Sequence, residues 1–371
     1  MKIRIEDLRQ KEPKDALPCF MPATFRLLGL LVVSLVTAGC QTTPRPGTMA
    51  PRTGDEIVVA GKFVHTGTPV VLWMDPDGYN AYQTENPAST AQTIDAETSN
   101  AEPRRTRPTR RYSQRRGSDL TDAENERVRK DGWDLPTLQK VVDQFVLHYD
   151  VAGTSRNCFN VLQRRGISVH FLLDIDGTLY QTLDLQEAAW HATTANNRSV
   201  GIEIANMGAY GKFEKSPLPA WYKKDEEGNT RIVLPPRFGD GGVRTPNFVG
   251  YPARPEPVTG RVQGGQLTQY DYTPEQYKAL SHLVAALSTT LPKIKCDYPR
   301  DAAGNLILRK LPEEELEAYG GVLGHFHVQS NKIDPGPAFQ WNLVIENARR
   351  LMEENAANAR RAPVLRSPRQ S

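Results

Sequence analysis

Apolar and polar residues between positions 135 and 210 follow a pattern that predicts short buried strands separated by a helix. An apolar run from Val141 to Leu147 ends at His148 and is typical of a buried strand. Similar runs predict strands over 168–173, 178–183 and 200–205, and the stretch 157–165 predicts a helix. Strands and helices alternate within one block, which indicates an α/β domain.

Two longer helices are predicted nearer the C-terminus. Apolar residues recur at helical spacing from Tyr277 to Leu287, with Thr273 as a candidate N-cap and Pro274 in the first turn. A final helix is predicted over 339–354, and we expect the basic tail 356–371 to be loose. Together these elements predict one α/β domain over 131–355.

Other segments of the chain lack this alternation. Residues 56–65 and 69–73 predict two short strands and a small appended β-hairpin. The polar stretch 84–130 contains seven arginines between Arg104 and Arg116. It is typical of a solvated, disordered linker, with binding to anionic lipids or cell-wall polymers as the alternative. Residues 211–270 are rich in glycine, proline and charge and predict a long surface insertion.

The N-terminus has the features of an export signal. An apolar run of about ten residues, Leu27 to Val36, is too short to span a bilayer and is followed by Thr-Ala-Gly-Cys40. This resembles the lipobox of bacterial lipoproteins, although Thr37 stands where leucine is usual. The resemblance implies a signal over 1–40, with Met21 as a candidate start, lipidation of Cys40 and a tether over 41–130. Gln41 favours the outer membrane; a plain signal peptide or a buried apolar segment is the alternative.

Charge and cysteine content add limited information. The net charge of +3 is too small to indicate a nucleic-acid partner, and 39% hydrophobic residues is ordinary for a globular protein. Of the four cysteines, only Cys158 and Cys296 lie beyond the predicted lipidation site. An oxidising compartment permits a disulfide between them, but the sequence leaves this open.

Histidines cluster at the ends of the predicted strands and in one short polar segment. The segment Gly324–Pro337 contains His325, His327, Lys332 and Asp334 and ends in a Pro-Gly-Pro turn. Histidines spaced through a compact domain, beside a carboxylate and a lysine, indicate a metal site. This segment and four others, in this order, resemble the type 2 N-acetylmuramoyl-L-alanine amidases: Phe145-Val-Leu-His148, the run Ser168 to Gly177, Ala189-Trp-His191-Ala192 and Ser199-Val-Gly-Ile-Glu203. The resemblance covers about residues 130–350 and implies an α/β fold with a central mixed β-sheet flanked by helices and a zinc site in a surface groove.

The resemblance implies a role for each matching residue. His148, His325 and Asp334 would bind Zn²⁺ and leave a fourth position for water. Glu203 would be the general base, and Lys332 would stabilise the oxyanion. His191 and Asn197 are candidate substrate contacts. If the segment after Gly324 is extended, His325 and His327 share a face and both could approach the metal; we favour His325 because it follows a glycine at the end of an apolar strand.

The function implied is zinc-dependent hydrolysis of the amide between N-acetylmuramic acid and L-alanine in peptidoglycan or muropeptides. Two alternatives remain: a non-catalytic peptidoglycan-binding lipoprotein, and a zinc amidase that acts on a different peptide bond. The presence of all three expected ligands favours an enzyme. The predicted location is the cell envelope, with a lipid anchor at Cys40 holding the protein to the outer membrane, facing the periplasm.

Overall fold

The computed structural model describes residues 52–83, 110–117 and 119–361. Its centre is a six-stranded mixed sheet in the order β15-β5-β9-β6-β7-β3. The first four strands run parallel to one another, β7 is antiparallel to β6, and β3 is parallel to β7. The strands are β3 (Val70–Leu72), β5 (Gln144–Tyr149), β6 (Phe171–Leu173), β7 (Leu179–Gln181), β9 (Ser199–Ile204) and β15 (Gly321–Gly324). The predicted α/β fold with a central mixed sheet is confirmed.

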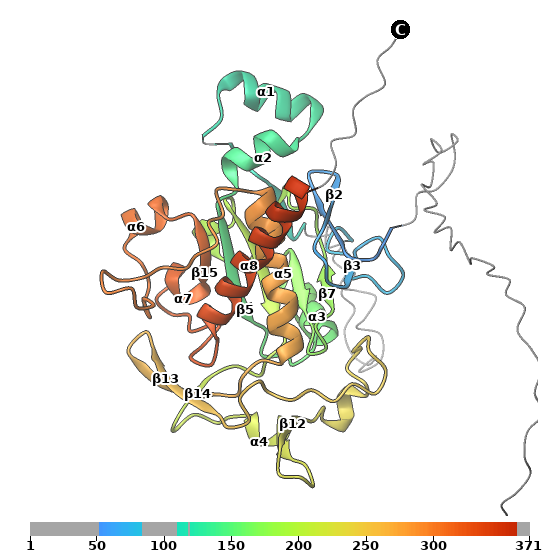
Figure 1. Ribbon diagram of the computed structural model, residues 1–371, viewed down its shortest axis with the longest axis vertical. Coiled ribbons are helices and arrows are strands. Elements are labelled where there is room, and N and C mark those ends of the chain that lie inside the picture. Colours follow the sequence, from blue (N-terminus) through green and yellow to red (C-terminus); the bar gives the residue numbers. More distant parts are fainter. Residues whose placement is uncertain (1–51, 84–109, 118, 362–371) are drawn as a thin grey trace, which may run out of the picture. The chain divides into compact units, whose positions relative to one another are not determined.

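The two faces of this sheet have different partners. α5 (Pro274–Thr290) and α8 (Trp341–Arg361) lie side by side across one face (Figure 1). Val200, Ile202 and Ile204 of β9 join the apolar core beneath these helices. Because side chains alternate along a strand, Gly201 and Glu203 face the opposite side. On that side α3 (Ser155–Arg165) packs Phe159 and Leu162 against the sheet, and a polar site has room to form.

The helix predictions are confirmed where capping signals were clear. Thr273 caps α5 with a capping box to Gln276, and Pro274 is its first residue. The predicted strand over 141–147 begins later than expected. α2 (Leu135–Val141) occupies its first residue, because Asp134 caps a helix whose Leu138 and Val141 are buried. The final helix also continues to Arg361, so the prediction of a loose tail is wrong for residues 356–361.

The insertion forms its own small core next to the main sheet. It contains two small antiparallel sheets, β10-β14-β13 and β11-β12. Met207, Leu218, Trp221 and Tyr222 form the small core, whereas Val262 of β13 and Leu267 of β14 pack into the main core. Its elements are β10 (Tyr210–Gly211), α4 (Leu218–Trp221), β11 (Tyr222–Lys224), β12 (Thr230–Ile232), η2 (Pro236–Phe238), β13 (Val258–Val262) and β14 (Gly265–Gln269). These segments lie together below the sheet in the view of Figure 1.

Two predictions for the N-terminal part need correction. The hairpin is β1 (Glu56–Val59) with β2 (Lys62–His65), both inside the first predicted strand, whereas β3 joins the central sheet. The predicted disordered linker is wrong for its described residues after 110. These form β4 (Tyr112–Gln114), which pairs with β8 (Glu187–Ala189), and α1 (Asp122–Asp131). Backbone pairing, the single buried aromatic ring of Tyr112 and a buried arginine hold β4. One apolar residue among arginines makes no strand pattern, so the hydrophobic pattern gave no signal.

The remaining short elements complete the description: η1 (Thr193–Ala195), α6 (Glu313–Ala318) and α7 (His325–Val328). Cys158 and Cys296 are both free thiols, so the disulfide left open by the sequence does not form. Among the helices of the described residues, none combines the length and apolar character needed to span a membrane.

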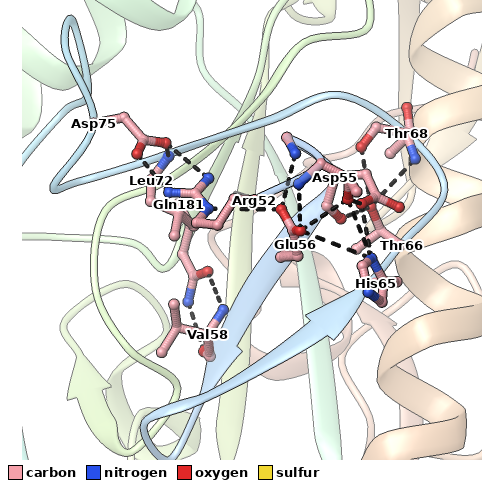
Figure 2. A network of polar contacts seen from close by, with 12 residues as sticks. Arg52, Asp55, Glu56, Val58, His65, Thr66, Thr68, Leu72, Asp75 and Gln181 are labelled. Atoms are coloured by element: carbon pink, nitrogen blue, oxygen red, sulfur yellow. Dashed lines mark hydrogen bonds and ion pairs between the residues drawn. The ribbon is translucent and has the colours of Figure 1, made fainter. Parts of the chain in front are cut away.

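A polar network ties the β1–β2 hairpin to the preceding chain (Figure 2). The buried carboxylate of Glu56 accepts hydrogen bonds from the Thr53 backbone N–H (2.7 Å), the Thr53 hydroxyl (2.8 Å) and the Gly54 N–H (2.9 Å). Burial alone would raise the pKa of Glu56, but these hydrogen bonds outweigh it and lower the pKa from 4.5 to about 2. The ionised carboxylate therefore stabilises the fold.

We expect Glu56→Gln to lower the free energy of unfolding at neutral pH by about 1.5–3 kcal/mol, the usual range for hydrogen bonds to a charged group. Because the folded-state pKa is lowered, this contribution is complete above pH 4.5 and is lost as the pH falls towards 2. Urea unfolding of both proteins at several pH values measures the difference. A gap that stays constant from pH 7 to pH 3 would contradict the assignment.

Candidate metal centre and catalytic cleft

Three residues of the site lie at the same end of three neighbouring parallel strands. His148 on β5 is paired in register with Glu203 on β9, so their side chains emerge from the same face of the sheet. His325 directly follows Gly324, which pairs with Leu147, the residue before His148. In α/β sheets, the carboxyl ends of parallel strands are where ligand sites form. The topology thus brings together residues that are 177 positions apart in the sequence.

Asp334 completes a compact set of possible metal ligands. The Nδ1 atoms of His148 and His325 are 2.9 Å apart, and Asp334 Oδ2 lies 2.9 Å from the first and 3.0 Å from the second. All three residues are buried, with 2%, 5% and 7% of their surfaces exposed in the same order. Zinc ligands about 2.1 Å from a tetrahedral ion are about 3.4 Å apart, close to this triangle. Two imidazoles and one carboxylate that converge in this way suit a catalytic zinc.

The outer nitrogens of both imidazoles are also held by hydrogen-bonding partners. His325 Nε2 lies 2.6 Å from Gln329 Oε1, and His148 Nε2 lies 3.0 Å from His191 Nδ1. A proton on each Nε2 leaves the Nδ1 lone pair free for a metal, and such partners are typical of metal-binding histidines. Burial, and then His325, lower the pKa of His148 to about 4, which favours the neutral ring that a metal requires.

The carboxylate of Asp334 is ionised in this environment. Burial opposes its ionisation, but the His325 and His148 rings outweigh this effect and lower the pKa of Asp334 below its ordinary value. An ionised carboxylate is the form that binds a divalent cation, so this environment prepares Asp334 for a metal.

The structure separates the two candidate histidines of the Gly324–Pro337 segment. This segment is not extended: residues 325–328 form α7, so His325 and His327 point in different directions. His327 Nε2 contacts the carbonyl of Ile307 at 2.7 Å, and its Nδ1 accepts the Gly324 N–H at 2.9 Å. Both its nitrogens are therefore used in the protein core. His325 is the residue that joins the cluster.

Glu203 and Lys332 face the same cleft as these three residues. The cleft has a volume of about 680 Å³, and one of its walls is the face of α3 formed by Asn157, Asn160, Val161 and Arg164. Trp221 and Phe238 of the insertion also line the cleft. One oxygen of Glu203, Oε2, is buried and has no hydrogen-bond partner among the described residues. Burial, and then Asp334 and Asp150, raise the pKa of Glu203 well above its ordinary value, which suits a group that must accept a proton.

The sequence profile of the N-acetylmuramoyl-L-alanine amidase family matches residues 138–337, more than half of the chain. The chain belongs to this family. The matched segment contains every residue of the metal cluster together with Glu203 and Lys332. It also contains the whole insertion, whereas β1 to β4 and α1 precede it. This peptidoglycan amidase thus has structural elements outside its family domain.

Several solved structures are similar to this amidase at low sequence identity. AmpD, solved as a selenomethionine derivative, is 16% identical over 65% of this chain and 91% of that chain, with a TM-score of 0.30. AmiD from E. coli, in complex with anhydro-N-acetylmuramic acid-L-Ala-D-γ-Glu-L-Lys, is 18% identical over 56% and 57%, with a TM-score of 0.30. The endolysin amidase LysCS from Clostridium intestinale is 16% identical over 58% and 86%, with a TM-score of 0.29. No curated protein sequence matches this amidase significantly.

The other predicted site residues of this amidase have different surroundings. His191 lines the cleft and contacts His148, so it lies beside the metal cluster. Asn197 does not line the cleft; its side-chain amide pairs with the backbone of Arg116 instead. The prediction that Asn197 contacts substrate is therefore not supported. Cys40, the predicted lipidation site, lies outside the described residues.

Some residues that shape the site gave no usable signal in the sequence. Asp150 is one: its Oδ1 accepts the N–H groups of Ala152 (2.9 Å), Gly153 (3.0 Å) and Asn206 (3.1 Å), which joins two cleft-forming loops. Gln329, which orients His325, is another. An aspartate after a strand and a glutamine in a polar segment are common in any protein, so only the fold shows these contacts.

Proposed function

We propose that this protein is a zinc-dependent amidase that hydrolyses the bond between the lactyl group of N-acetylmuramic acid and the L-alanine of the stem peptide. The observation that carries the proposal is the triangle of His148, His325 and Asp334 atoms, 2.9–3.0 Å apart, beside a glutamate with an unpaired buried oxygen. A non-catalytic binding protein needs neither the ligand triangle nor an acid held at a raised pKa.

His148, His325 and Asp334 would hold the zinc ion, which when bound supplies a Lewis acid and lowers the pKa of water. Glu203 takes the proton of the attacking water on its unpaired Oε2 and later returns it to the leaving amine of L-alanine. Lys332 lines the same cleft, where its ammonium group can stabilise the oxyanion that develops on the scissile carbonyl. His191 holds His148 in the orientation that leaves Nδ1 free.

The cleft suits a polar, carboxylate-bearing peptide substrate. Its rim contains the exposed side chains of Arg164 and Arg165 on α3 and of Arg237 in the insertion. Arginine pairs well with carboxylates because its planar donors match their geometry. Two asparagines on the same wall add hydrogen-bonding groups for peptide bonds. A basic, open cleft favours a stem peptide over a neutral apolar peptide.

The test is release of stem peptides from purified peptidoglycan by a soluble form that begins after Cys40. We expect mass spectrometry to detect peptides with a free L-alanine N-terminus, to lose them with a zinc chelator and to recover them when zinc is restored. Cleavage at another peptide bond would replace the substrate assignment but keep the metal chemistry. Binding without cleavage would overturn the enzyme proposal.

We also propose that the protein acts in the cell envelope, tethered through lipid on Cys40. The support is the apolar run 27–36 followed by Thr-Ala-Gly-Cys40, with Gln41 favouring the outer membrane. Membrane fractionation of cells that produce the wild type and the Cys40→Ser variant tests this: the variant should leave the membrane fraction. Equal membrane association of the two proteins would contradict the anchor.

A further inference from the structure

Arg115 is a buried cation outside the family domain that the reaction does not use. It follows β4 and is only 4% exposed. The family profile begins 23 residues later, at position 138. Arg115 forms no ion pair with any residue that the structure describes. Burial of an unpaired charge is costly, so its retention calls for an explanation from the groups it contacts.

The Arg115 guanidinium donates to four backbone carbonyls of one loop. Nε donates to Leu185 O (2.8 Å), Nη1 to Asn197 O (2.7 Å) and to Asn196 O (3.4 Å), and Nη2 to Ser199 O (2.9 Å). The Leu185 carbonyl lies just before β8, and the other three lie between β8 and the first residue of β9. Arg115 thus closes the two ends of the 185–199 loop onto each other.

Neighbouring residues attach the same loop to β4. Arg116 exchanges two hydrogen bonds with the Asn197 side chain: its N–H donates to Oδ1 (2.5 Å) and its carbonyl accepts from Nδ2 (2.7 Å). The Ser168 hydroxyl bridges the backbones of Arg111 and Trp190. Burial lowers the pKa of Arg115 to about 9, with Glu187 and Asp184 opposing, so the guanidinium remains charged at neutral pH.

The loop held by Arg115 carries His191, the residue that contacts the metal ligand His148. Asn196 Oδ1 accepts the backbone N–H groups of His191 (3.0 Å) and Ala192 (2.6 Å). The His191 ring is fixed at both nitrogens, by His148 Nε2 at 3.0 Å and by the Ser199 hydroxyl at 3.2 Å. It also lies directly over Gly201, where an added Cβ would be 2.5 Å from the ring. A displaced loop would therefore move His191 away from His148.

We propose that Arg115 is a positioning residue of the metal centre: it fixes the 185–199 loop so that His191 holds the His148 imidazole with Nδ1 free for zinc. The inference rests on the proposed zinc function. It extends the functional unit beyond the family domain, because the guanidinium is supplied by the arginine-rich segment before it. Arg115 touches neither the ligand triangle nor the cleft.

The test measures zinc affinity by chelator competition and the absorption spectrum of the Co²⁺-loaded protein, for the wild type, Arg115→Met and Arg115→Lys. We expect Arg115→Met to bind zinc about 10–100-fold more weakly, as usual when the support of a metal ligand is lost. The Co²⁺ spectrum should change because the orientation of His148 changes. Lysine should restore only part of the affinity, since it cannot reach four carbonyls at once.

A double-mutant cycle separates positioning from general destabilisation. If Arg115 acts through His191, Arg115→Met should have almost no further effect on zinc affinity in a His191→Ala background. Arg349→Met is a control for the same substitution at an exposed arginine: Arg349 donates to the Cys296 carbonyl and pairs with Asp297, and this variant should bind zinc like the wild type. If Arg115→Met does not fold, Asn196→Ala, which frees only the His191 end of the loop, must show the same loss.

The outcomes distinguish this inference from the proposed function. A wild-type protein that fails to bind zinc would refute the zinc function itself. Two results would overturn the positioning role and leave the zinc function intact. One is a folded Arg115→Met protein that binds zinc as tightly as the wild type. The other is an Arg115→Met substitution that lowers zinc affinity by the same factor in the wild-type and His191→Ala backgrounds.

Discussion

Glu203→Gln should lower the rate of amide hydrolysis by about 10²–10⁴-fold, the range that a general base contributes. Glutamine has nearly the same shape but cannot take the proton of the attacking water. The variant should keep its fold, because a neutral side chain at this half-buried position does not add the cost of burying a charge. It should also keep zinc, because Glu203 is not one of the three residues, His148, His325 and Asp334, whose ligand atoms converge.

The measurement is the rate of stem-peptide release at saturating muropeptide, combined with zinc content and thermal unfolding. Glu313→Gln, at an exposed carboxylate in α6, is the matched control and should retain the wild-type rate. Glu203 is not the base if the glutamine variant keeps more than about a tenth of the wild-type rate, since general-base catalysis contributes at least about 10²-fold. A loss of zinc in parallel with activity would instead make Glu203 a part of the metal site.

The site could largely be predicted from the sequence because its residues follow elements that local patterns specify. His148, Glu203 and His325 stand in or directly after apolar strands, and parallel strands that are neighbours bring such residues together. The choice between His325 and His327 could not be settled in this way. It depends on whether four residues form a helix or a strand, and Phe326 and Val328 are compatible with both.

The elements that the sequence missed or assigned to the wrong partner are held by contacts between distant residues. β3 belongs to the central sheet because it pairs with β7, more than one hundred positions away, although its sequence looks like half of a local hairpin. β4 lies in a polar, arginine-rich stretch, and its pairing with β8 depends on backbone groups. Asn197 shows the same limit: its distance from Glu203 in sequence is short, but the turn at η1 directs it towards Arg116.

His325→Ala should abolish tight zinc binding and with it all hydrolysis, whereas His327→Ala should retain both. The two histidines are two residues apart and both buried, with 5% and 0% of their surfaces exposed, so they form a closely matched pair of substitutions. Only His325 Nδ1 lies within 3.0 Å of the other two ligand atoms, while His327 donates to Ile307 and accepts from Gly324. His327→Ala should therefore lower the free energy of unfolding by about 1–3 kcal/mol, because buried backbone groups lose their partner.

Zinc content after dialysis, and unfolding temperature with and without added zinc, measure both effects. Zinc that binds only the native state raises the unfolding temperature, so the wild type and His327→Ala should respond to zinc and His325→Ala should not. This result would place the metal at the ends of β5 and β15, where His148, His325 and Asp334 meet. A His325→Ala protein that still binds zinc tightly, beside a His327→Ala protein that does not, would reverse the ligand assignment and require a rearranged α7.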